Sequence, residues 1–276
     1  MKLQEKFKEL RKNRNAVLAT NFYNYETAKG VLMAAKVTNQ PLILQLSKSS
    51  INYLGLSVAF KLAKSMLEYH RVEGWVHLDH GDSVDLAERC LDTGFNSVMI
   101  DASEKPFREN VKITRAVVKL AEKYDASVEA ELGYVAKLGQ SAASVAFTQP
   151  EEAKIFVEET GVNALAVAIG SAHGFYKKTP KLDLDRLSEI ERITDVALVL
   201  HGGSGIPDLS LQEAIRHGIC KINLATEIKD VYMKTLKQVL KTEHKIDLRQ
   251  VFPPATEAVA ALVEKKLSVI QKSDGK

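Results

Sequence analysis

Short apolar runs recur along the chain at wide, fairly regular intervals, and longer amphipathic segments separate them. The runs are rich in Val, Ile, Leu and Ala and are bounded by polar residues or glycine. Such continuously apolar runs are typical of strands that are buried on both faces of a parallel sheet. The runs cover residues 16–20, 41–46, 74–79, 97–101, 127–132, 164–169, 196–201 and 219–224.

The segments between the runs carry apolar residues at steps of three and four, which is the spacing of one helix face. Several begin at Ser, Asp or Pro and end at Gly or Asp, as capped helices do. Eight strand–helix repeats predict an α/β fold of the (β/α)8 TIM-barrel type. A doubly wound open sheet is the alternative, but it usually has fewer strands and often a glycine-rich loop after the first one. The residues that follow the first run here, 20–27, read TNFYNYET.

The end of the chain departs from the repeat. Residues 232–276 are helix-like, with an irregular patch, KIDLRQVFPPAT, before the last helix. No linker-like composition interrupts the chain, so we expect one domain over residues 1–276, a barrel with a C-terminal helical extension. Residues 1–15 form a charged amphipathic helix rather than a signal peptide. No stretch approaches the ~18 consecutive apolar residues of a membrane span.

Composition and charge narrow the class of protein. The chain has 276 residues, 45% hydrophobic and 26% charged, which is ordinary for a globular protein. The balance of 38 basic and 35 acidic residues favours neither nucleic acid nor a membrane as a partner. Two cysteines far apart, Cys90 and Cys220, indicate buried thiols in a reducing compartment rather than a disulfide framework. We therefore expect a cytoplasmic protein.

The predicted strands share one feature, a chemically capable side chain at the carboxyl end. Barrel enzymes place their functional groups at this end of the strands. A random polar terminus would more often be Ser, Thr, Gly or Asn, whereas most of these side chains bind metals or transfer protons. The strand ends carry Asn21, Ser47, Asp79 with His80, Asp101, Glu131, His173, His201 and Asn223.

Three of these strand-end residues are histidines, His80, His173 and His201. Three neutral imidazoles with one open position form a catalytic zinc site. Taken singly, each would more simply be a polar loop residue; together at one rim they favour a metal. Asp79, the last residue of a buried strand, is a candidate general acid/base beside that metal.

Two carboxylates and the remaining histidines complete the inventory. Asp101 and Glu131 can support a second cation position or hydrogen-bond the metal ligands; exposed strand-end carboxylates are the alternative. His77 lies inside the third strand and is expected to be packed or to support the site. The histidines expected to be structural are His70, His217 and His244.

Glycine-rich loops follow three of the last strands. HGGSGIPD (201–208) and NLAT (223–226) follow the seventh and eighth strands, and IGSAHG (169–174) follows the sixth. Backbone N–H groups at a helix start favour an anion, and barrels often bind phosphate after strands seven and eight. The alternative is that these are only tight turns. Lys221, the one lysine inside a predicted strand, keeps open a competing Schiff-base route to carbonyl chemistry.

Six motifs, in unbroken order between about residues 16 and 262, resemble those of the class II, metal-dependent ketose-bisphosphate aldolases. They are LDHGDS, MIDAS followed by EN, VEAELG, AVAIGSAHG, LVLHGGSGIP and KINLATE. The resemblance implies a lyase that reversibly cleaves a phosphorylated ketose, such as fructose bisphosphate, to dihydroxyacetone phosphate and an aldehyde. The implied route is a zinc-stabilised enediolate with Asp79 as acid/base.

The resemblance also assigns the other site residues. It implies that His80, His173 and His201 bind Zn²⁺, that Asp101 and Glu131 form an alternative or second metal position, and that a monovalent cation binds near the glycine loops. Arg249 matches an arginine that reaches the substrate of a neighbouring subunit, which implies a homodimer or homotetramer. Asn21 and Ser47 match substrate-side positions. The phosphate-binding positions match Gly174, Gly202, Gly203, Ser204, Asn223 and Thr226.

The sequence departs from the family at two places. After the VEAELG motif the family has a mobile loop with Gly-Gly and an acid that handles the second proton. Leu138 and Gly139 stand about where the acid would be, and the loop has no acid. Lys137 lies in the same loop and is expected to be solvated, with contact to an anionic substrate tail as the alternative. Leu18-Ala19-Thr20 replaces a common Pro-Ala-Phe. A different substrate therefore stays open (tagatose bisphosphate, an inositol-derived phosphoketonate or a sulfo-sugar phosphate), as does a non-catalytic homologue that binds metal and phosphate.

Overall fold

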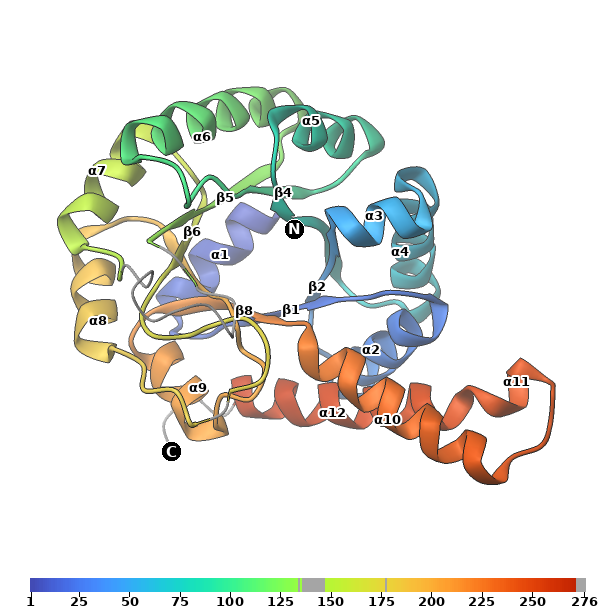
Figure 1. The fold of residues 1–276 in the computed structure, drawn as a ribbon. Coiled ribbons are helices and arrows are strands. Elements are labelled where there is room, and N and C mark those ends of the chain that lie inside the picture. Colours follow the sequence, from blue (N-terminus) through green and yellow to red (C-terminus); the bar gives the residue numbers. More distant parts are fainter. Residues whose placement is uncertain (134, 136–146, 177, 272–276) are drawn as a thin grey trace.

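A computed structural model of the chain describes residues 1–133, 135, 147–176 and 178–271. Eight parallel strands form a closed barrel in sequence order, and the last strand pairs with the first (Figure 1). The predicted TIM barrel is therefore confirmed, and the open sheet is wrong. The strands are β1 (Val17–Asn21), β2 (Leu42–Ser47), β3 (Gly74–Gly81), β4 (Ser97–Ile100), β5 (Ser127–Leu132), β6 (Ala164–Val167), β7 (Ala197–Leu200) and β8 (Ile219–Leu224).

Helices follow the strands and form an outer ring around the barrel (Figure 1). Side-chain caps start several of them: Asn24, Ser83 and Asp183 each accept a hydrogen bond from a backbone N–H in the first turn. The ring contains α2 (Tyr25–Thr38), α3 (Lys48–Leu54), α4 (Leu56–His70), α5 (Val84–Thr93), α6 (Phe107–Ala121), a 3₁₀ turn (Glu122–Tyr124), α7 (Pro150–Thr160), α8 (Leu184–Ile193) and α9 (Asp208–Arg216).

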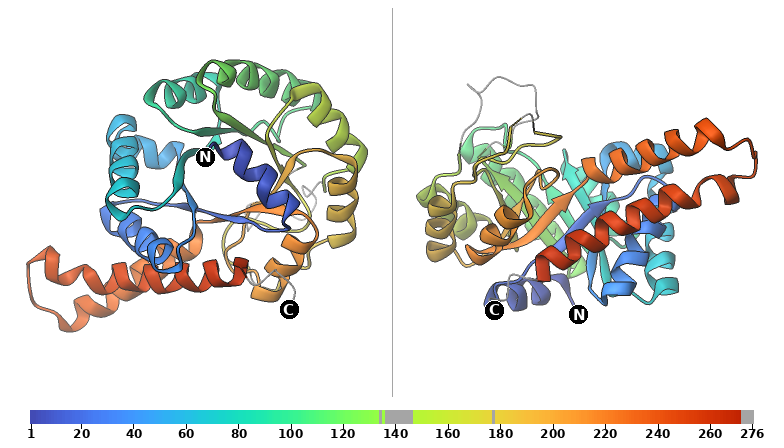
Figure 2. Two further views of the ribbon diagram at one scale, coloured as in Figure 1. Left: turned by 180° about the vertical axis from the view of Figure 1, so that it is seen from behind. Right: turned by 90° about the horizontal axis from the view of Figure 1, so that it is seen from below.

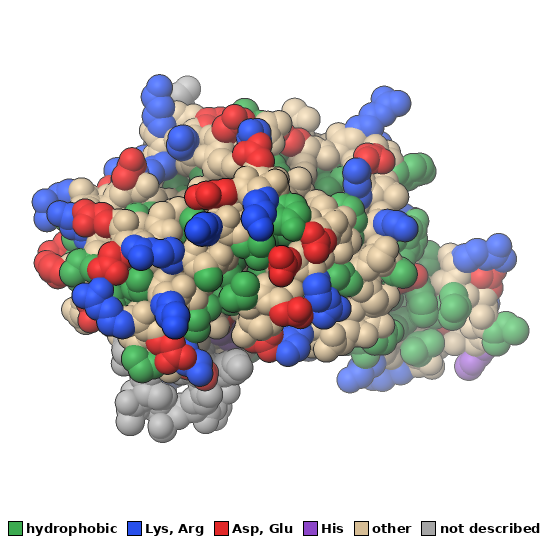
Figure 3. Space-filling model, turned by 90° about the horizontal axis from the view of Figure 1, so that it is seen from above, with side chains coloured by type: hydrophobic (Ala, Val, Ile, Leu, Met, Phe, Trp, Pro, Cys, Tyr) green, Lys and Arg blue, Asp and Glu red, His purple; other side chains and the backbone are tan. Residues whose placement is uncertain are grey.

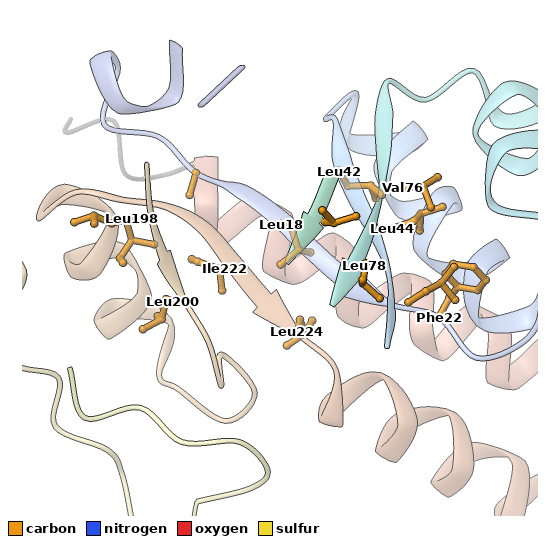
Figure 4. Close-up of a cluster of buried hydrophobic side chains, with 14 of the residues drawn as sticks. Leu18, Phe22, Leu42, Leu44, Val76, Leu78, Leu198, Leu200, Ile222 and Leu224 are labelled. Atoms are coloured by element: carbon orange, nitrogen blue, oxygen red, sulfur yellow. The ribbon is translucent and has the colours of Figure 1, made fainter. Parts of the chain in front are cut away.

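The main hydrophobic core lies between the strands and this ring of helices. Alternate residues of each strand face outward into it; on β2 these are Leu42, Leu44 and Leu46, all fully buried. Leu42 pairs in register with Leu18, and Leu44 with Val76, so the outward side chains form layers (Figure 4). Because the intervening residues face a barrel interior that is also buried, the strands read as continuous apolar runs.

The barrel interior changes from apolar to polar along its axis. The layers near the amino-terminal ends of the strands hold Val17, Ile43 and Trp75. Helix α1 (Leu3–Lys12) packs Leu3 and Phe7 against them. Figure 2 shows α1 lying across this end of the barrel. The N-terminal amphipathic helix thus closes the amino-terminal mouth. The polar interior side chains above these layers are fully or nearly fully buried and comprise Gln45, His77, Asp79, Glu129, Glu131, Lys221 and Asn223.

The C-terminal extension forms a helical arm, which we define as residues 226–271. It consists of α10 (Thr226–Thr242), α11 (Leu248–Val251) and α12 (Pro253–Gln271), and α10 and α12 run side by side away from the barrel (Figure 2). The arm is anchored where α12 crosses α2. The two helix backbones approach so closely at Gly30 of α2 that a Cβ there would lie 2.6 Å from the backbone oxygen of Thr256 in α12. The predicted extension is confirmed.

The surface gives two further facts. On the face in Figure 3, basic and acidic side chains are interspersed, while hydrophobic side chains gather on the arm. The apolar residues near its far end include Leu240, Ile246 and Leu248, and Ile246 is 96% exposed. Among the described residues, no helix combines the length and the hydropathy that a membrane crossing requires.

Candidate active site

The carboxyl ends of the strands bring four metal-binding side chains into one group. His80, Glu131, His173 and His201 each offer a ligand atom, and these four atoms lie within 4.8 Å of one another. The three imidazole rings are neighbours, with centroids 4.7–5.7 Å apart. Three nitrogen donors and one carboxylate oxygen at this spacing suit a zinc ion. The structure thus places the three predicted ligands together, while their metal-binding role stays a prediction.

His80 is held in an unusual backbone conformation at the end of β3. Its φ angle is +49°, in the left-handed region that non-glycine residues rarely occupy, and the pairing of β3 with β4 shifts register at this point. The His80 Nδ1 lies 2.7 Å from Asp101 Oδ2, and Ser103 holds the other oxygen of Asp101. Donation from Nδ1–H to Asp101 leaves Nε2 of His80 for a metal. Asp101 thus contacts His80 as a supporting group would, while its role at a metal stays a prediction.

His201 is clamped between two carboxylates. Its Nδ1 lies 2.9 Å from Glu131 Oε2, and its Nε2 lies 3.0 Å from Glu129 Oε1. Burial lowers the pKa of His201, but the hydrogen bonds to Glu129 and Glu131 outweigh it and raise the pKa to about 10. In His173, burial and the neighbouring imidazoles lower the pKa to about 3. Without a metal, His201 is therefore an imidazolium and His173 a neutral ring, and the charge of Asp79 together with the hydrogen bond to Asp101 outweighs burial and raises the pKa of His80 as well.

Asp79 lies beside the histidine cluster but outside the four-donor group. Asn21 Nδ2 donates to its Oδ2 at 2.9 Å, and Asn223 Nδ2 donates to its Oδ1 at 3.4 Å. Burial raises the pKa of Asp79, but the positive charges of His80, His201 and Lys221 and the Asn21 hydrogen bond bring it below its usual value. Asp79 is thus an ionised, hydrogen-bonded carboxylate next to the cluster, as a general base requires.

The glycine loops after β6, β7 and β8 are tied together. Gly202 has φ +69°, and a Cβ there would lie 2.2 Å from the backbone oxygen of Ala172. The Tyr176 hydroxyl accepts from the Ala172 N–H at 2.7 Å and donates to the Gly202 carbonyl at 2.9 Å. Gly203 N–H donates to the Asn223 carbonyl at 3.0 Å. Hydrogen bonds therefore hold the loops that carry His173 and His201 together as one rigid unit. We call this unit, residues 169–174 and 201–208, the loop floor.

Other predicted phosphate-binding residues lie on the same floor. Gly174, which follows His173, has φ +107°. The Ser204 Oγ accepts from the backbone N–H of Glu227, and Thr226 is the first residue of α10. The Gly203 N–H already donates to a backbone carbonyl of the protein, so it cannot donate to a phosphate. Gly203 can contribute to a phosphate site only because it has no side chain, which lets a phosphate come close to the backbone.

Two predicted substrate contacts and the altered loop lie apart from this group. Ser47 ends β2 and caps α3, where its Oγ accepts from the backbone N–H of Ser50. Arg249 lies on the arm, with a side chain 90% exposed and paired with Asp247 at 3.0 Å. The loop residues Lys137, Leu138 and Gly139 lie outside the described residues.

Three supporting residues were not predicted. Gln45 donates to Asn21 Oδ1 at 3.2 Å, Glu129 holds His201, and Tyr176 joins two loops. Gln45 and Glu129 each lie two residues before a predicted strand-end residue, Ser47 and Glu131. Because strands repeat every two residues, this spacing was a usable signal for both. Tyr176 follows the first glycine loop, IGSAHG (169–174), and gave no such signal.

Lys221 faces the barrel interior, as the Schiff-base alternative requires, but its surroundings oppose that role. It is fully buried, its Nζ donates to Glu129 Oε2 at 2.8 Å, and it lies 3.4 Å from His77 Nε2. The other nitrogen of His77 lies 2.9 Å from Ser97 Oγ. An ammonium group held by a carboxylate is a poor nucleophile. His77 is a packed supporting group, as expected.

Solved aldolase structures share this fold. The chain resembles the YdjI aldolase of Escherichia coli K12 at 29% identity, with a TM-score of 0.88 and coverage of 99% of this chain and 97% of the other. A putative fructose-1,6-bisphosphate aldolase of Coccidioides immitis is 28% identical, with a TM-score of 0.87 and coverage of 98% and 96%. The fructose-bisphosphate aldolase of Campylobacter jejuni, at 20% identity, shares the fold with a TM-score of 0.83, covering 98% and 94%.

The family assignment rests on the whole chain. The family model described as fructose-bisphosphate aldolase class-II matches residues 1–276. The match includes the barrel, the rim that carries the histidine cluster and the C-terminal arm. The chain therefore belongs to the class II fructose-bisphosphate aldolase family.

Proposed function

We propose that this protein is a metal-dependent aldolase that reversibly cleaves a phosphorylated ketose to dihydroxyacetone phosphate and an aldehyde. A substrate like fructose 1,6-bisphosphate is the first candidate, in keeping with the aldolase relatives. The observation that carries the proposal is the pairing of an ionised, buried Asp79 with a three-histidine cluster of which it is not a member. This arrangement separates the proton-transfer group from the groups that fit a metal.

The proposed metal is zinc. His80, His173 and His201 would hold it, and Glu131 stands close enough to join or replace one of them. When bound, zinc acts as a Lewis acid that polarises the substrate carbonyl and stabilises negative charge as the carbon–carbon bond breaks. A second divalent cation near Asp101 and Glu131, and a monovalent cation near the glycine loops, are part of the proposal.

Asp79 takes the proton from the C4 hydroxyl in the cleavage direction. Its two oxygens are oriented by Asn21 and Asn223, and Gln45 in turn orients Asn21, so the carboxylate cannot rotate freely. A general base fixed in this way contributes roughly 10²–10⁴-fold to the rate.

The loop floor is the proposed phosphate site. We assign the phosphate of the dihydroxyacetone half to Gly174, Gly202, Gly203 and Ser204, with Asn223 and Thr226 beside them and with Asn21 and Ser47 on the substrate side. The rigidity that Tyr176 gives the floor favours this role, because a fixed phosphate aligns the reacting carbon.

We propose a homodimer or homotetramer. Arg249 sits on an arm that runs away from its own barrel, with exposed Leu240, Ile246 and Leu248 nearby. Burial of these side chains against a second subunit would bring Arg249 toward that subunit's substrate. The two buried, free cysteines, Cys90 and Cys220, suit the reducing cytoplasm, which is the proposed location.

A panel of ketose phosphates tests the proposal. The purified protein is assayed with fructose 1,6-bisphosphate, tagatose 1,6-bisphosphate and unphosphorylated fructose, each with zinc, and dihydroxyacetone phosphate is measured with a coupled dehydrogenase. We expect cleavage of at least one bisphosphate and none of fructose. No cleavage of any member, combined with tight zinc binding, would favour the non-catalytic homologue, for which the loop without an acid is the one supporting feature.

Borohydride trapping separates the two aldolase chemistries. If Lys221 formed a Schiff base, borohydride added with substrate would leave a covalent adduct on it. We expect no adduct by mass spectrometry, because Lys221 is buried and ion-paired.

A further inference from the structure

We infer that Glu129 and Lys221 are a positioning pair that sets the orientation and the tautomer of His201 for the metal. The inference rests on the proposed metal site and goes beyond its ligands. It concerns a fully buried ion pair in the barrel interior that the proposed chemistry does not itself use.

The geometry defines a linear relay from strand to strand. Lys221 of β8 donates from Nζ to Glu129 Oε2 at 2.8 Å, across the barrel to β5. The other oxygen of Glu129, Oε1, lies 3.0 Å from His201 Nε2 at the end of β7. Lys221 therefore occupies one oxygen of Glu129 and leaves the other for His201, so Glu129 cannot rotate away without breaking an ion pair.

The relay fixes which nitrogen of His201 is available. A carboxylate oxygen only accepts, so Nε2 must carry a hydrogen that it donates to Glu129. Nδ1 also faces a carboxylate oxygen, Glu131 Oε2 at 2.9 Å, so the imidazolium donates from both nitrogens. Because Glu129 lies outside the group of metal-binding donors, Nε2 would keep its hydrogen there, and Nδ1 would give up its hydrogen to bind a metal. Glu131 belongs to the four-donor group with His80 and His173. The donor nitrogen of His201 is thereby aimed at the cluster.

The burial of the pair makes a purely structural role a weak explanation. Lys221 is 0% and Glu129 1% exposed. Removing two charges from water costs free energy that their attraction often fails to recover, and apolar replacements are often neutral or stabilising. The register partners of the pair on the neighbouring strands are apolar: Ala164 beside Glu129, and Val17 and Val199 beside Lys221. The fold can fill this layer with apolar side chains, whereas a ligand histidine needs an acceptor for its second nitrogen.

Metal affinity of matched variants tests the pair. The variants are Glu129→Gln, Lys221→Met and the double variant. The double variant leaves no unpaired buried charge, so it remains a test if a single variant fails to fold. Zinc affinity is measured by competition with a chromophoric chelator, and the Co²⁺-substituted protein reports ligand geometry through its visible spectrum. Ile190→Ala, in the buried face of α8, is the control that lowers stability without touching the relay.

We expect Glu129→Gln to weaken zinc binding about 10–100-fold, as loss of a carboxylate behind a ligand histidine does. The Co²⁺ spectrum should shift. Lys221→Met should weaken binding in the parent background but add less than about threefold in the Glu129→Gln background, because it acts through Glu129. Ile190→Ala should keep the parent affinity and spectrum while unfolding at lower urea.

Two outcomes would overturn the inference. Parent-like zinc affinity and an unchanged Co²⁺ spectrum in Glu129→Gln would show that the pair does not position His201, while the proposed aldolase stands. Independent, additive effects of the two substitutions would also contradict the relay. If the parent protein itself binds no zinc and needs none for turnover, the proposed metal mechanism fails, and the pair's role fails with it.

Discussion

Substitution of Asp79 by alanine separates the proton-transfer group from the metal group. Because Asp79 is not one of the four clustered donors, the variant should keep about one zinc per chain. Loss of a fixed general base costs roughly 10²–10⁴ in kcat, or about 3–5 kcal/mol of transition-state stabilisation. KM should change much less, because the loops of the proposed phosphate site are untouched.

Stability should fall moderately in the same variant. Asp79→Ala leaves two buried amide donors, those of Asn21 and Asn223, without their acceptor, and each such loss costs about 1–3 kcal/mol. Removal of a buried carboxylate relieves its desolvation and offsets part of that loss. We therefore expect a net destabilisation of at most about 3 kcal/mol.

The assay is steady-state cleavage of the preferred ketose bisphosphate, with zinc content determined on the same samples. Asp79→Asn is the matched control, since it keeps the size of the side chain and one acceptor oxygen while removing the charge and the basicity, and it should be nearly as slow as the alanine variant. Cleavage by Asp79→Ala at close to the parent rate would refute the assigned role. Loss of zinc together with activity would show that Asp79 is a ligand.

Three further predictions concern the ligands, the loop floor and pH. His80→Ala or His173→Ala should lose bound zinc, as measured by metal analysis after gel filtration; full zinc content in both would contradict the cluster. Gly202→Ala places a Cβ 2.2 Å from the Ala172 carbonyl oxygen at a positive φ. We therefore expect the free energy of unfolding in urea to fall by about 1–3 kcal/mol and KM to rise. If both quantities stayed at their parent values, the argument that these loops are rigid would fail. Since the pKa of His201 is raised from 6.5 to about 10 in the metal-free fold, its stabilisation is complete below pH 6.5 and is lost as pH rises toward 10. Zinc binding near pH 8 should therefore release protons, that of His201 among them, visible as buffer-dependent heats in calorimetry; heats that are the same in all buffers would contradict it.

The barrel was predictable because its signal repeats. Eight continuously apolar runs locate eight strands, and a strand buried on both faces leaves such a run in the sequence. The histidine cluster was also predictable, because parallel strands of a barrel end on one rim. His80, His173 and His201 are scattered over the sequence and still converge there.

The supporting contacts were harder to predict, because they depend on side-chain partners across the barrel. Glu129 looks like half of a repeated acidic pair with Glu131, and only the structure shows that the two take opposite nitrogens of His201. A lysine inside a strand, such as Lys221, fits a nucleophile by its sequence position alone, and only its ion pair with Glu129 argues against that role. The positive φ of His80 leaves no mark in the sequence; it coincides with a register shift between β3 and β4 that only the strand pairing shows.

Metal dependence of cleavage tests the central claim most directly. The protein is stripped with a chelator, passed through a desalting column and assayed for ketose bisphosphate cleavage before and after stoichiometric zinc, with His173→Ala treated in parallel. We expect turnover to vanish on stripping, to return with about one zinc per chain, and to stay absent in His173→Ala. Undiminished cleavage by the stripped protein would contradict the metal mechanism.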